Sequence, residues 1–324
     1  MIISKTPFRI SFCGGGTDLR EFYKCKSGAV VSTAINKYMY ITVNKKFDNE
    51  IRIGYSRTEN VKNVDEIKHE LVREAMKMAG ITQGIEITSM ADIHSRGTGL
   101  GSSSSFLVGL LNALFAFKGE HKSAEFLAKK ACEIEIDTLK GPIGKQDQYI
   151  AAYGGLNYIK FNPNESVFVE PIICKDHVVQ RLQQNLLLFY SGLTKKSNEI
   201  LYEQKANSKK RINILSKMAA LAGDAASAIS KGKLDEFGRL VHKNWIYKKQ
   251  LASGITNHLI EKYYEKAAKA GAIGGKILGA GGRGFLLIYC EEEKQKRVIN
   301  TLKDLRLTHF RFEPQGSRII YVGD

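Results

Sequence analysis

The chain has 324 residues, of which 43% are hydrophobic and 25% are charged. This length holds one large domain or two, and the composition is ordinary for a globular protein. The longest apolar runs, such as residues 285–290, are too short to span a bilayer. The first residues enter a strand-like segment without the cleavage site of a signal peptide, so we expect neither a membrane segment nor a secretion signal.

The formal net charge is +16, which raises the question of a nucleic-acid partner. The basic residues are spread along the chain, however, and no stretch interleaves aromatic residues with arginines as RNA-binding sheets do. We therefore expect a solvated, lysine-rich surface or attraction of small anionic substrates, and no nucleic acid. Five scattered cysteines without CxxC spacing argue against a disulfide framework or a zinc site, and they favour reduced thiols in a cytoplasm.

The first 90 residues alternate strand-like segments with turn residues. Periodicity predicts strands over residues 2–3, 8–12, 29–35 and 39–43, a helix over 65–79 and a strand over 85–88.

A glycine–serine loop follows, defined here as residues 97–104. Gly97, Gly99 and Gly101 alternate with other residues, four serines come next, and an apolar run at helical spacing starts at Phe106. Glycines allow close backbone approach to a ligand, and a helix beginning at the serines would direct its unpaired N–H groups toward the same place. This arrangement predicts an anion site, whereas the alternative, a flexible Ser/Gly linker, does not explain the helical run.

Beyond this loop, Ser123 is a predicted helix N-cap, and residues 162–165 mark a turn near the boundary between two halves. We expect domains over residues 1–170 and 171–324. The second half is predicted to contain strands at 186–190 and 285–290, helices at 196–230, 234–249, 257–270 and 291–305, and strand-like residues at 310–322. The mixture indicates an α+β or α/β fold.

Three glycine clusters occupy residues 14–16, 97–101 and 279–284. The third matches GxGxxG, but a strand follows it where a dinucleotide site requires a helix. HRD and DFG triplets and a GxxxxGK[ST] sequence are all absent, which argues against a protein kinase and a P-loop.

With Pro7–Phe8–Arg9, the three clusters resemble the three motifs of the GHMP kinases in order and spacing, over nearly the whole chain. The resemblance implies an α+β, two-domain fold. The N-terminal domain would be similar to a ribosomal small-subunit protein domain and the C-terminal domain would be ferredoxin-like, with the active site between them.

Residues 144–149, 187–194 and 245–256 resemble one branch of that family, the D-glycero-D-manno-heptose 7-phosphate kinases, which are similar to fucokinases. The implied reaction is ATP-dependent phosphorylation of an anomeric hydroxyl, with ATP and a sugar phosphate as ligands and Mg²⁺ as cofactor. A kinase for free fucose, and a catalytically silent sugar-phosphate sensor, remain as alternatives. The resemblance leaves a monomer and a homodimer equally open.

The resemblance also implies roles for individual residues. Asp147 would be the general base and Arg9 its partner, although a polar turn residue and a structural ion pair are the alternatives. Ser103 and Glu135 would hold Mg²⁺, unless Glu135 is a solvated helix carboxylate. The implied ATP-binding residues are Gly97, Thr98, Gly99, Leu100, Gly101, Ser102, Ser103 and Ser104.

The implied substrate-binding residues are Gly15, Gly16, Thr17, Asp18, Gly281 and Gly282. Two positions depart from the family pattern. Ser95 replaces a proline, and Arg283 replaces a glycine, where it either adds a cation near the phosphates or occupies a surface turn. A 7-phosphate would need a cation, for which Lys195, Lys196, Lys248 and Lys249 are candidates, or they are ordinary solvated lysines.

Overall fold

The computed structural model describes residues 1–93, 97–192 and 197–323, without the side chains of residues 197 and 198. The larger of two sheets contains β1 (Ile2–Cys13), β2 (Gly28–Lys45), β3 (Ile51–Gly54), β4 (Thr58–Val61), β5 (Ile85–Ala91), β6 (Leu156–Phe161), β7 (Val167–Pro171) and β12 (Arg318–Val322). The smaller sheet contains β8 (Leu186–Tyr190), β9 (Gly274–Ile277), β10 (Phe285–Tyr289) and β11 (Arg306–Leu307).

The helices are α1 (Arg20–Tyr23), α2 (Glu70–Ala79), α3 (Ser102–Phe117), α4 (Ala124–Cys132), α5 (Gln146–Tyr153), α6 (Asp176–Gln184), α7 (Ser197–Asn207), α8 (Ile212–Ser230), α9 (Leu234–Lys248), α10 (His258–Lys269) and α11 (Glu292–Thr301). Single turns of 3₁₀-helix occur at η1 (Val64–Glu66) and η3 (Ser253–Ile255), and a π-helical turn, η2 (Glu133–Thr138), continues α4.

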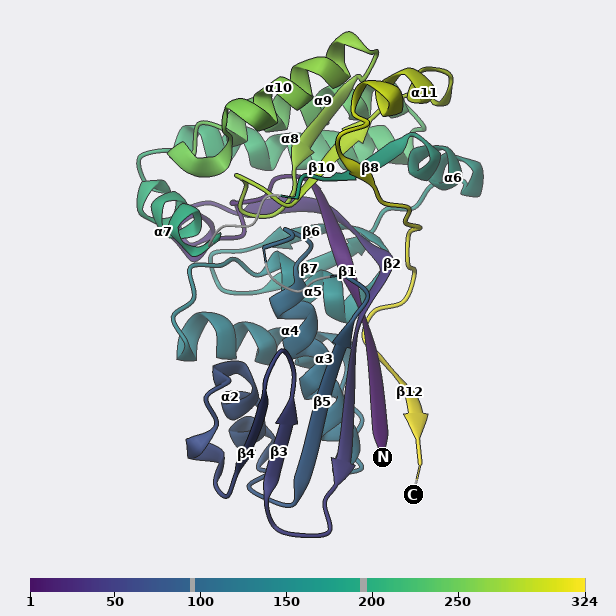
Figure 1. The fold of residues 1–324 in the computed structure, drawn as a ribbon. Helices are drawn as coiled ribbons and strands as arrows, with labels where there is room; N and C mark the ends of the chain where they lie inside the picture. The colour runs from purple at the N-terminus through teal and green to yellow at the C-terminus, as the bar shows by residue number, and fades with distance from the viewer. Residues whose placement is uncertain (94–96, 193–196, 324) are drawn as a thin grey trace.

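The two sheets lie in two layers of the molecule. The larger sheet, with α2 to α5 against it, forms the lower part of Figure 1, and the smaller sheet lies above with α8 to α11. The larger sheet runs β12-β1-β2-β5-β3-β4, with β6 and β7 branching from β2, and the smaller runs β11-β8-β10-β9. This arrangement confirms the predicted α+β class.

The length of β2 explains the branched sheet. Its first residues pair with β6, from Gly28 opposite Phe161, and its last residues pair with β5, from Met39 opposite Ala91. The four predicted strands of the first 45 residues are therefore two long ones, β1 and β2, paired along most of their length.

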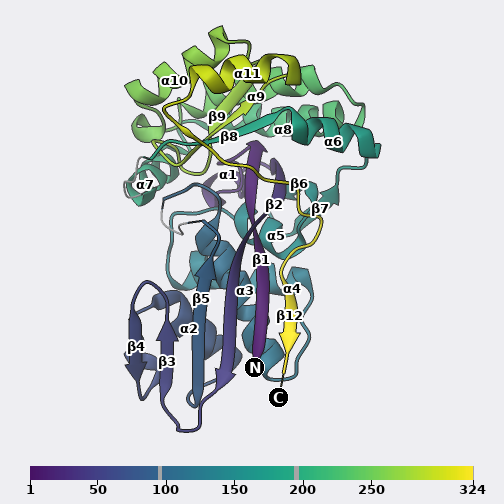
Figure 2. The ribbon, with the colours of Figure 1, turned by 45° about the vertical axis from the view of Figure 1, so that its right-hand side comes forward.

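The last strand, β12, returns from the upper part to pair antiparallel with β1, so both termini lie at the same end of the molecule (Figure 2). The predicted C-terminal segment 171–324 thus supplies one strand to the sheet of the N-terminal segment. The position of the domain boundary at residue 170 stays a prediction.

One of the two hydrophobic clusters spans both parts, and the other lies mostly in the upper part. The ring of Phe12 in β1 meets Phe237 of α9 with centroids 5.3 Å apart, and Phe237 meets Tyr289 of β10 at 5.8 Å. All three rings are fully buried, and each contributes about 1.5–3 kcal/mol by leaving water. This packing fixes the position of the first glycine cluster relative to the third.

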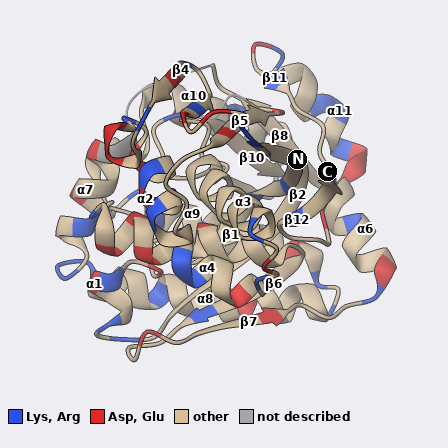
Figure 3. Ribbon diagram, turned by 90° about the horizontal axis from the view of Figure 1, so that it is seen from below, with Lys and Arg blue, Asp and Glu red and all other residues tan. Residues whose placement is uncertain are grey.

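Basic and acidic residues alternate along the helices in the ribbon seen from below (Figure 3). Within the described ranges, no helix combines the length and the apolar character needed to cross a membrane.

Candidate functional site

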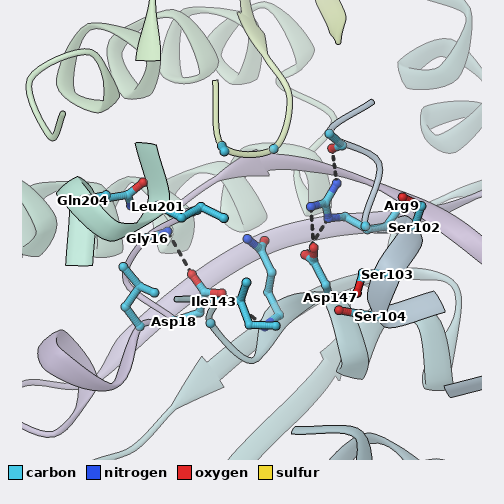
Figure 4. A pocket seen from close by; sticks show the side chains of 18 of the residues that line it. Arg9, Gly16, Asp18, Ser102, Ser103, Ser104, Ile143, Asp147, Leu201 and Gln204 are labelled. Atoms are coloured by element: carbon cyan, nitrogen blue, oxygen red, sulfur yellow. Dashed lines mark hydrogen bonds and ion pairs between the residues drawn. The ribbon is translucent and has the colours of Figure 1, made fainter. Parts of the chain in front are cut away.

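A cavity of about 260 Å³ lies where the three glycine clusters meet (Figure 4). Of the residues predicted for the site, those that line it are Arg9, Gly15, Gly16, Asp18, Gly97, Thr98, Gly99, Gly101, Ser102, Ser103, Ser104, Glu135 and Asp147. Two of these residues, Arg9 and Asp147, are 138 positions apart in the chain and form an ion pair.

The glycine–serine loop forms one wall. Gly97, Gly99 and Gly101 all have positive φ, between 71° and 78°, and α3 begins at Ser102, as the sequence predicts. The first-turn N–H groups of a helix have no partner within the helix, and its dipole is positive at this end. The wall is thus suited to a phosphate group.

Leu100, a predicted ATP-binding residue of the loop, does not direct its side chain into the cavity. Its side chain is completely buried in the core, while its carbonyl accepts the N–H of Arg9 at 3.1 Å. The residue anchors the loop to β1 and does not line the cavity. Ser95, which stands where the family pattern has a proline, lies outside the described residues.

Arg9 and Asp147 form a two-pronged ion pair. Nε of Arg9 donates to Oδ1 and its Nη2 donates to Oδ2 of the aspartate, both at 2.7 Å. The third prong, Nη1, donates to the Gly99 carbonyl at 2.5 Å, which ties the pair to the glycine–serine loop. Paired donors of this geometry are among the stronger polar contacts in proteins, and they fix the carboxylate in the cavity wall.

Glu135 is buried beside the start of α3. Its Oε1 accepts the Ser103 hydroxyl at 2.7 Å, and its Oε2 accepts the Ser104 hydroxyl at 2.8 Å and the Gln148 amide at 2.5 Å. Burial raises the pKa of this carboxyl, and the three donors oppose the rise. The reading of Glu135 as a solvated helix carboxylate is therefore wrong.

The pair formed by Ser103 and Glu135 fits a magnesium ion in its donor chemistry. One hydroxyl oxygen and one carboxylate oxygen meet at the cavity wall, and Mg²⁺ prefers few protein oxygens supplemented by substrate phosphates and water. A cation placed there would also compensate the charge that burial disfavours on Glu135.

Asp18 organises the first glycine cluster. Its Oδ1 accepts the Gly16 N–H at 2.9 Å, and its Oδ2 accepts the Gln146 N–H at 3.2 Å. Burial raises the pKa of Asp18, while both N–H groups lower it. Gly144 packs so closely against this carboxylate that an added Cβ would overlap it. Asp18 thus joins the glycine turn to the start of α5.

Thr17 does not line the cavity. Its hydroxyl donates to the Ala29 carbonyl at 2.9 Å and accepts the Ala29 N–H at 3.0 Å, fully buried. The residue supports the turn from behind, because its side chain is used entirely by β2.

The third loop, residues 279–284, has a different place from the one expected. Gly279 and Ala280 line the cavity, but Gly281 and Gly282 pack against Gly254 and Ile255, and the Gly282 N–H donates to the Ile255 carbonyl at 2.7 Å. The predicted substrate contacts of Gly281 and Gly282 are thus replaced by contacts with η3, because both glycines turn away from the cavity toward that helix turn.

The same loop supports the glycine–serine loop directly. A Cβ on Gly279 would overlap Gly99, and a Cβ on Gly284 would overlap the Thr98 carbonyl. The glycines of the second and third clusters therefore allow two backbones to touch. Arg283 is 3% exposed and does not line the cavity, which excludes the surface-turn reading.

Several lining residues were not predicted as site residues. They are Leu19, Ile143, Gly144, Gln146, Leu201, Gln204, Gly279 and Ala280. Lys248, one of the four lysines that the sequence offered for a substrate phosphate, also lines the cavity. Lys248 follows Asn244 by four residues on α9, so the two side chains share one helix face. Because Asn244 binds the first glycine cluster, this spacing was a sequence signal that Lys248 also faces it.

Comparison with known proteins identifies two family models. Residues 66–155 match the GHMP kinases N terminal domain, and residues 225–305 match the GHMP kinases C terminal model. The two matches carry the second and third glycine clusters respectively.

Individual relatives agree with these matches. The chain is 28% identical to a D-glycero-alpha-D-manno-heptose 7-phosphate kinase of Campylobacter jejuni, over 97% of each chain. It is 29% identical to an L-fucokinase/L-fucose-1-P guanylyltransferase of Bacteroides fragilis, over 90% of this chain and 35% of that one. A D-glycero-D-manno-heptose 1-phosphate kinase structure from Bacteroides thetaiotaomicron shares the fold, with a TM-score of 0.83, 24% identity and full coverage of both chains.

Proposed function

The chain belongs to the GHMP kinases, and on that premise we propose that it phosphorylates the anomeric hydroxyl of D-glycero-D-manno-heptose 7-phosphate with ATP. The product would be the 1,7-bisphosphate, a precursor of nucleotide-activated heptose for surface polysaccharide. The observation that carries the proposal is the Arg9–Asp147 pair set against a phosphate-binding loop in one cavity. The heptose assignment is supported by the relative that matches over 97% of each chain.

The glycine–serine loop and the Arg9–Asp147 pair would have different roles in the reaction. The glycine–serine loop and the start of α3 would hold the ATP phosphates through backbone N–H groups, which positions the terminal phosphorus for attack. Asp147 would accept the proton of the anomeric hydroxyl as that oxygen attacks. Arg9 would keep the carboxylate aimed, because it donates to both of its oxygens from one side.

Magnesium would be held by the Ser103 hydroxyl and the Glu135 carboxylate, with Ser104 and Gln148 fixing the orientation of Glu135. When bound, it supplies charge neutralisation for the phosphate oxygens.

The sugar would occupy the part of the cavity between Asp18 and Gln204. Gly15 and Gly16 leave room there for a hydroxylated ring, and Gln146 and Gln204 offer amides to it. The buried Oε1 of Gln146 has no hydrogen-bond partner among the described residues, so a sugar hydroxyl could satisfy it.

A free-sugar 1-kinase acting on fucose is the second candidate. It is favoured by the match to the Bacteroides fragilis fucokinase, which covers 90% of this chain. A free sugar needs no cation for a terminal phosphate, and Lys249 is already paired with Glu261 at 3.0 Å. Lys195 and Lys196 lie outside the described residues.

We expect the reaction to take place in the cytoplasm, where ATP and sugar phosphates are found together.

The deciding experiment is ADP release with a panel of sugars and sugar 7-phosphates, followed by NMR of the product to locate the new phosphate. We expect the highest kcat/KM with the heptose 7-phosphate and a new phosphate on the anomeric carbon. Turnover of fucose in preference to the heptose phosphate would move the proposal to the second candidate, and no turnover of any sugar would end it.

A further inference from the structure

Lys248, the last residue of α9, places a buried ammonium group in the cavity wall. The residue is 5% exposed, and its Nζ donates to the Gly279 carbonyl at 2.5 Å. On the other side it approaches the glycine turn, since a Cβ built on Gly15 would lie 3.9 Å from Nζ. The ammonium therefore lies between the first and third glycine clusters.

The position of Lys248 is held by the helix that carries it. One turn earlier on the same face, the Oδ1 of Asn244 accepts the Gly14 N–H at 3.0 Å, and Asn244 is fully buried. The neighbouring Trp245 is also fully buried in the upper core. Helix α9 is thus fixed against the glycine turn, and the Lys248 stem has little freedom to leave the cavity.

The charge of Lys248 is not cancelled by the protein. Within the described residues, no carboxylate forms an ion pair with its Nζ, and the single hydrogen bond is to a carbonyl. The nearest carboxylates are otherwise engaged, Asp147 with Arg9 and Asp18 with two backbone N–H groups. An ammonium has three donors, so two remain for a ligand. Buried charges are normally paired, and an anionic ligand would supply the missing partner.

We propose that Lys248 binds a non-bridging oxygen of the terminal phosphoryl group of ATP and accompanies that group to the sugar. The inference rests on the proposed kinase function. In the transfer, the bond between the anomeric oxygen and the terminal phosphorus forms, the bond from that phosphorus to the β–γ bridging oxygen breaks, and ADP leaves with the electron pair. The hydroxyl proton passes to Asp147, while Lys248 keeps its own protons throughout.

The terminal phosphoryl group is favoured over a phosphate of the sugar by the neighbours of Lys248. Its acceptor, Gly279, is in backbone contact with Gly99 of the glycine–serine loop. Gly99 in turn accepts Nη1 of Arg9, the partner of Asp147. Lys248 therefore lies beside the place where the phosphate loop and the proposed base converge.

The test compares binding of ADP with binding of the non-hydrolysable analogue AMPPNP, by calorimetry with magnesium present. Lys248→Met should weaken AMPPNP at least about 10-fold while ADP binds as in wild type, because a lost charge-assisted contact costs on the order of one factor of ten or more. Lys248→Arg should retain part of the AMPPNP preference. Lys243→Met, which removes an exposed lysine from the same helix, is the matched control and should change neither affinity.

Unchanged ADP binding also shows that the Lys248→Met protein is folded. Equal AMPPNP affinity in Lys248→Met and wild type would overturn the inference. So would a defect seen only as a raised KM for phosphorylated sugars, since that result would assign Lys248 to the phosphate of the substrate. Because nucleotide binding needs no sugar, failure of the heptose assignment leaves this test intact.

Discussion

Arg9 and Asp147 are sheltered to different degrees, and the difference matters for their roles. The Arg9 side chain is 4% exposed, whereas that of Asp147 is 23% exposed. Here the carboxylate keeps an open side toward the cavity while the guanidinium holds it from behind, which is the arrangement a base needs to meet a substrate hydroxyl.

Replacing Asp147 by Asn tests this role. The amide keeps the size of the side chain but cannot accept a proton, so we expect kcat to fall about 10²-fold or more with nearly unchanged ATP affinity. Steady-state kinetics and calorimetry measure the two effects. Asp137→Asn is the control, since Asp137 also pairs with an arginine, Arg20. A kcat of Asp147→Asn within about twofold of the Asp137→Asn value would make Asp147 structural.

The pH dependence of nucleotide binding follows from Lys248. Burial, and then the charge of Arg9, lower its pKa to about 8, while Asp18 and Asp147 act in the opposite direction. Lys276 on β9 is a further buried cation nearby, with Nζ donating to the Ser11 and Phe12 carbonyls. The ammonium is charged below about pH 8 and neutral above it, so the preference for AMPPNP over ADP should decrease as pH rises.

Calorimetry between about pH 7 and pH 9.5 checks this expectation. The preference should fall in wild type and stay nearly level in Lys248→Arg, whose guanidinium remains charged. A parallel decline in both proteins would attribute the titration to another group.

For some elements around the site, the local sequence pattern was sufficient to predict where a helix begins, and for others it was not. Helix α3 begins at the predicted serine, and Ser123 caps α4 by accepting the Phe126 N–H at 3.2 Å. The predicted helix over 65–79 is instead η1 followed by α2, because buried Ile67 is extended, with ψ of 120°. The predicted helix over 196–230 is likewise two helices, α7 and α8.

Contact between the second and third glycine clusters makes a prediction about Gly99. Its φ is +78°, and a Cβ would overlap the Leu278 carbonyl. We expect Gly99→Ala to weaken ATP at least about 10-fold by displacing the glycine–serine loop, in addition to the roughly 1–2 kcal/mol that a left-handed residue costs.

Gly119 provides the control, with φ of +77° and open space around its Cβ. Gly119→Ala carries the backbone cost alone. Urea unfolding should therefore show a loss of stability in both variants, whereas ATP titration should show weaker binding only in Gly99→Ala. Equal ATP affinity in both would mean that loop contact has no part in binding.

At the scale of the whole molecule, the last strand of the chain pairs with the first. Strand β12 forms one edge of the larger sheet, and Ser317 just before it shares hydrogen bonds with Thr6 and Asn112. The upper part of the molecule is therefore an insertion between strands of one sheet, joined to it by a common core.

Deleting residues 317–324 should lower the stability of the larger sheet. Loss of several strand hydrogen bonds, each worth about 0.5–1.5 kcal/mol, predicts a decrease of about 2–4 kcal/mol in the free energy of unfolding. Urea denaturation measures it, with deletion of residue 324 alone as the control, because that variant keeps the hydrogen bonds between Gly323 and Met1. A free energy of unfolding equal to that of the control would show that β12 adds nothing to the sheet.

The sequence by itself determined the family, and it pointed to the glycine–serine loop and to Arg9, Asp147, Ser103 and Glu135, which line one cavity. These predictions depend on local glycine conformations and on motifs that each fit in a few positions. Tertiary structure alone decided that Lys248 enters the cavity, that Gly281 and Gly282 turn away from it, and that β12 completes the larger sheet. The place of Lys248 and that of β12 depend on packing between segments more than 200 residues apart, such as Gly14 with Asn244 and β1 with β12. The place of Gly281 and Gly282 depends on their contact with η3. Local periodicity carries no information about such contacts, since burial and charge pairing are properties of the assembled core.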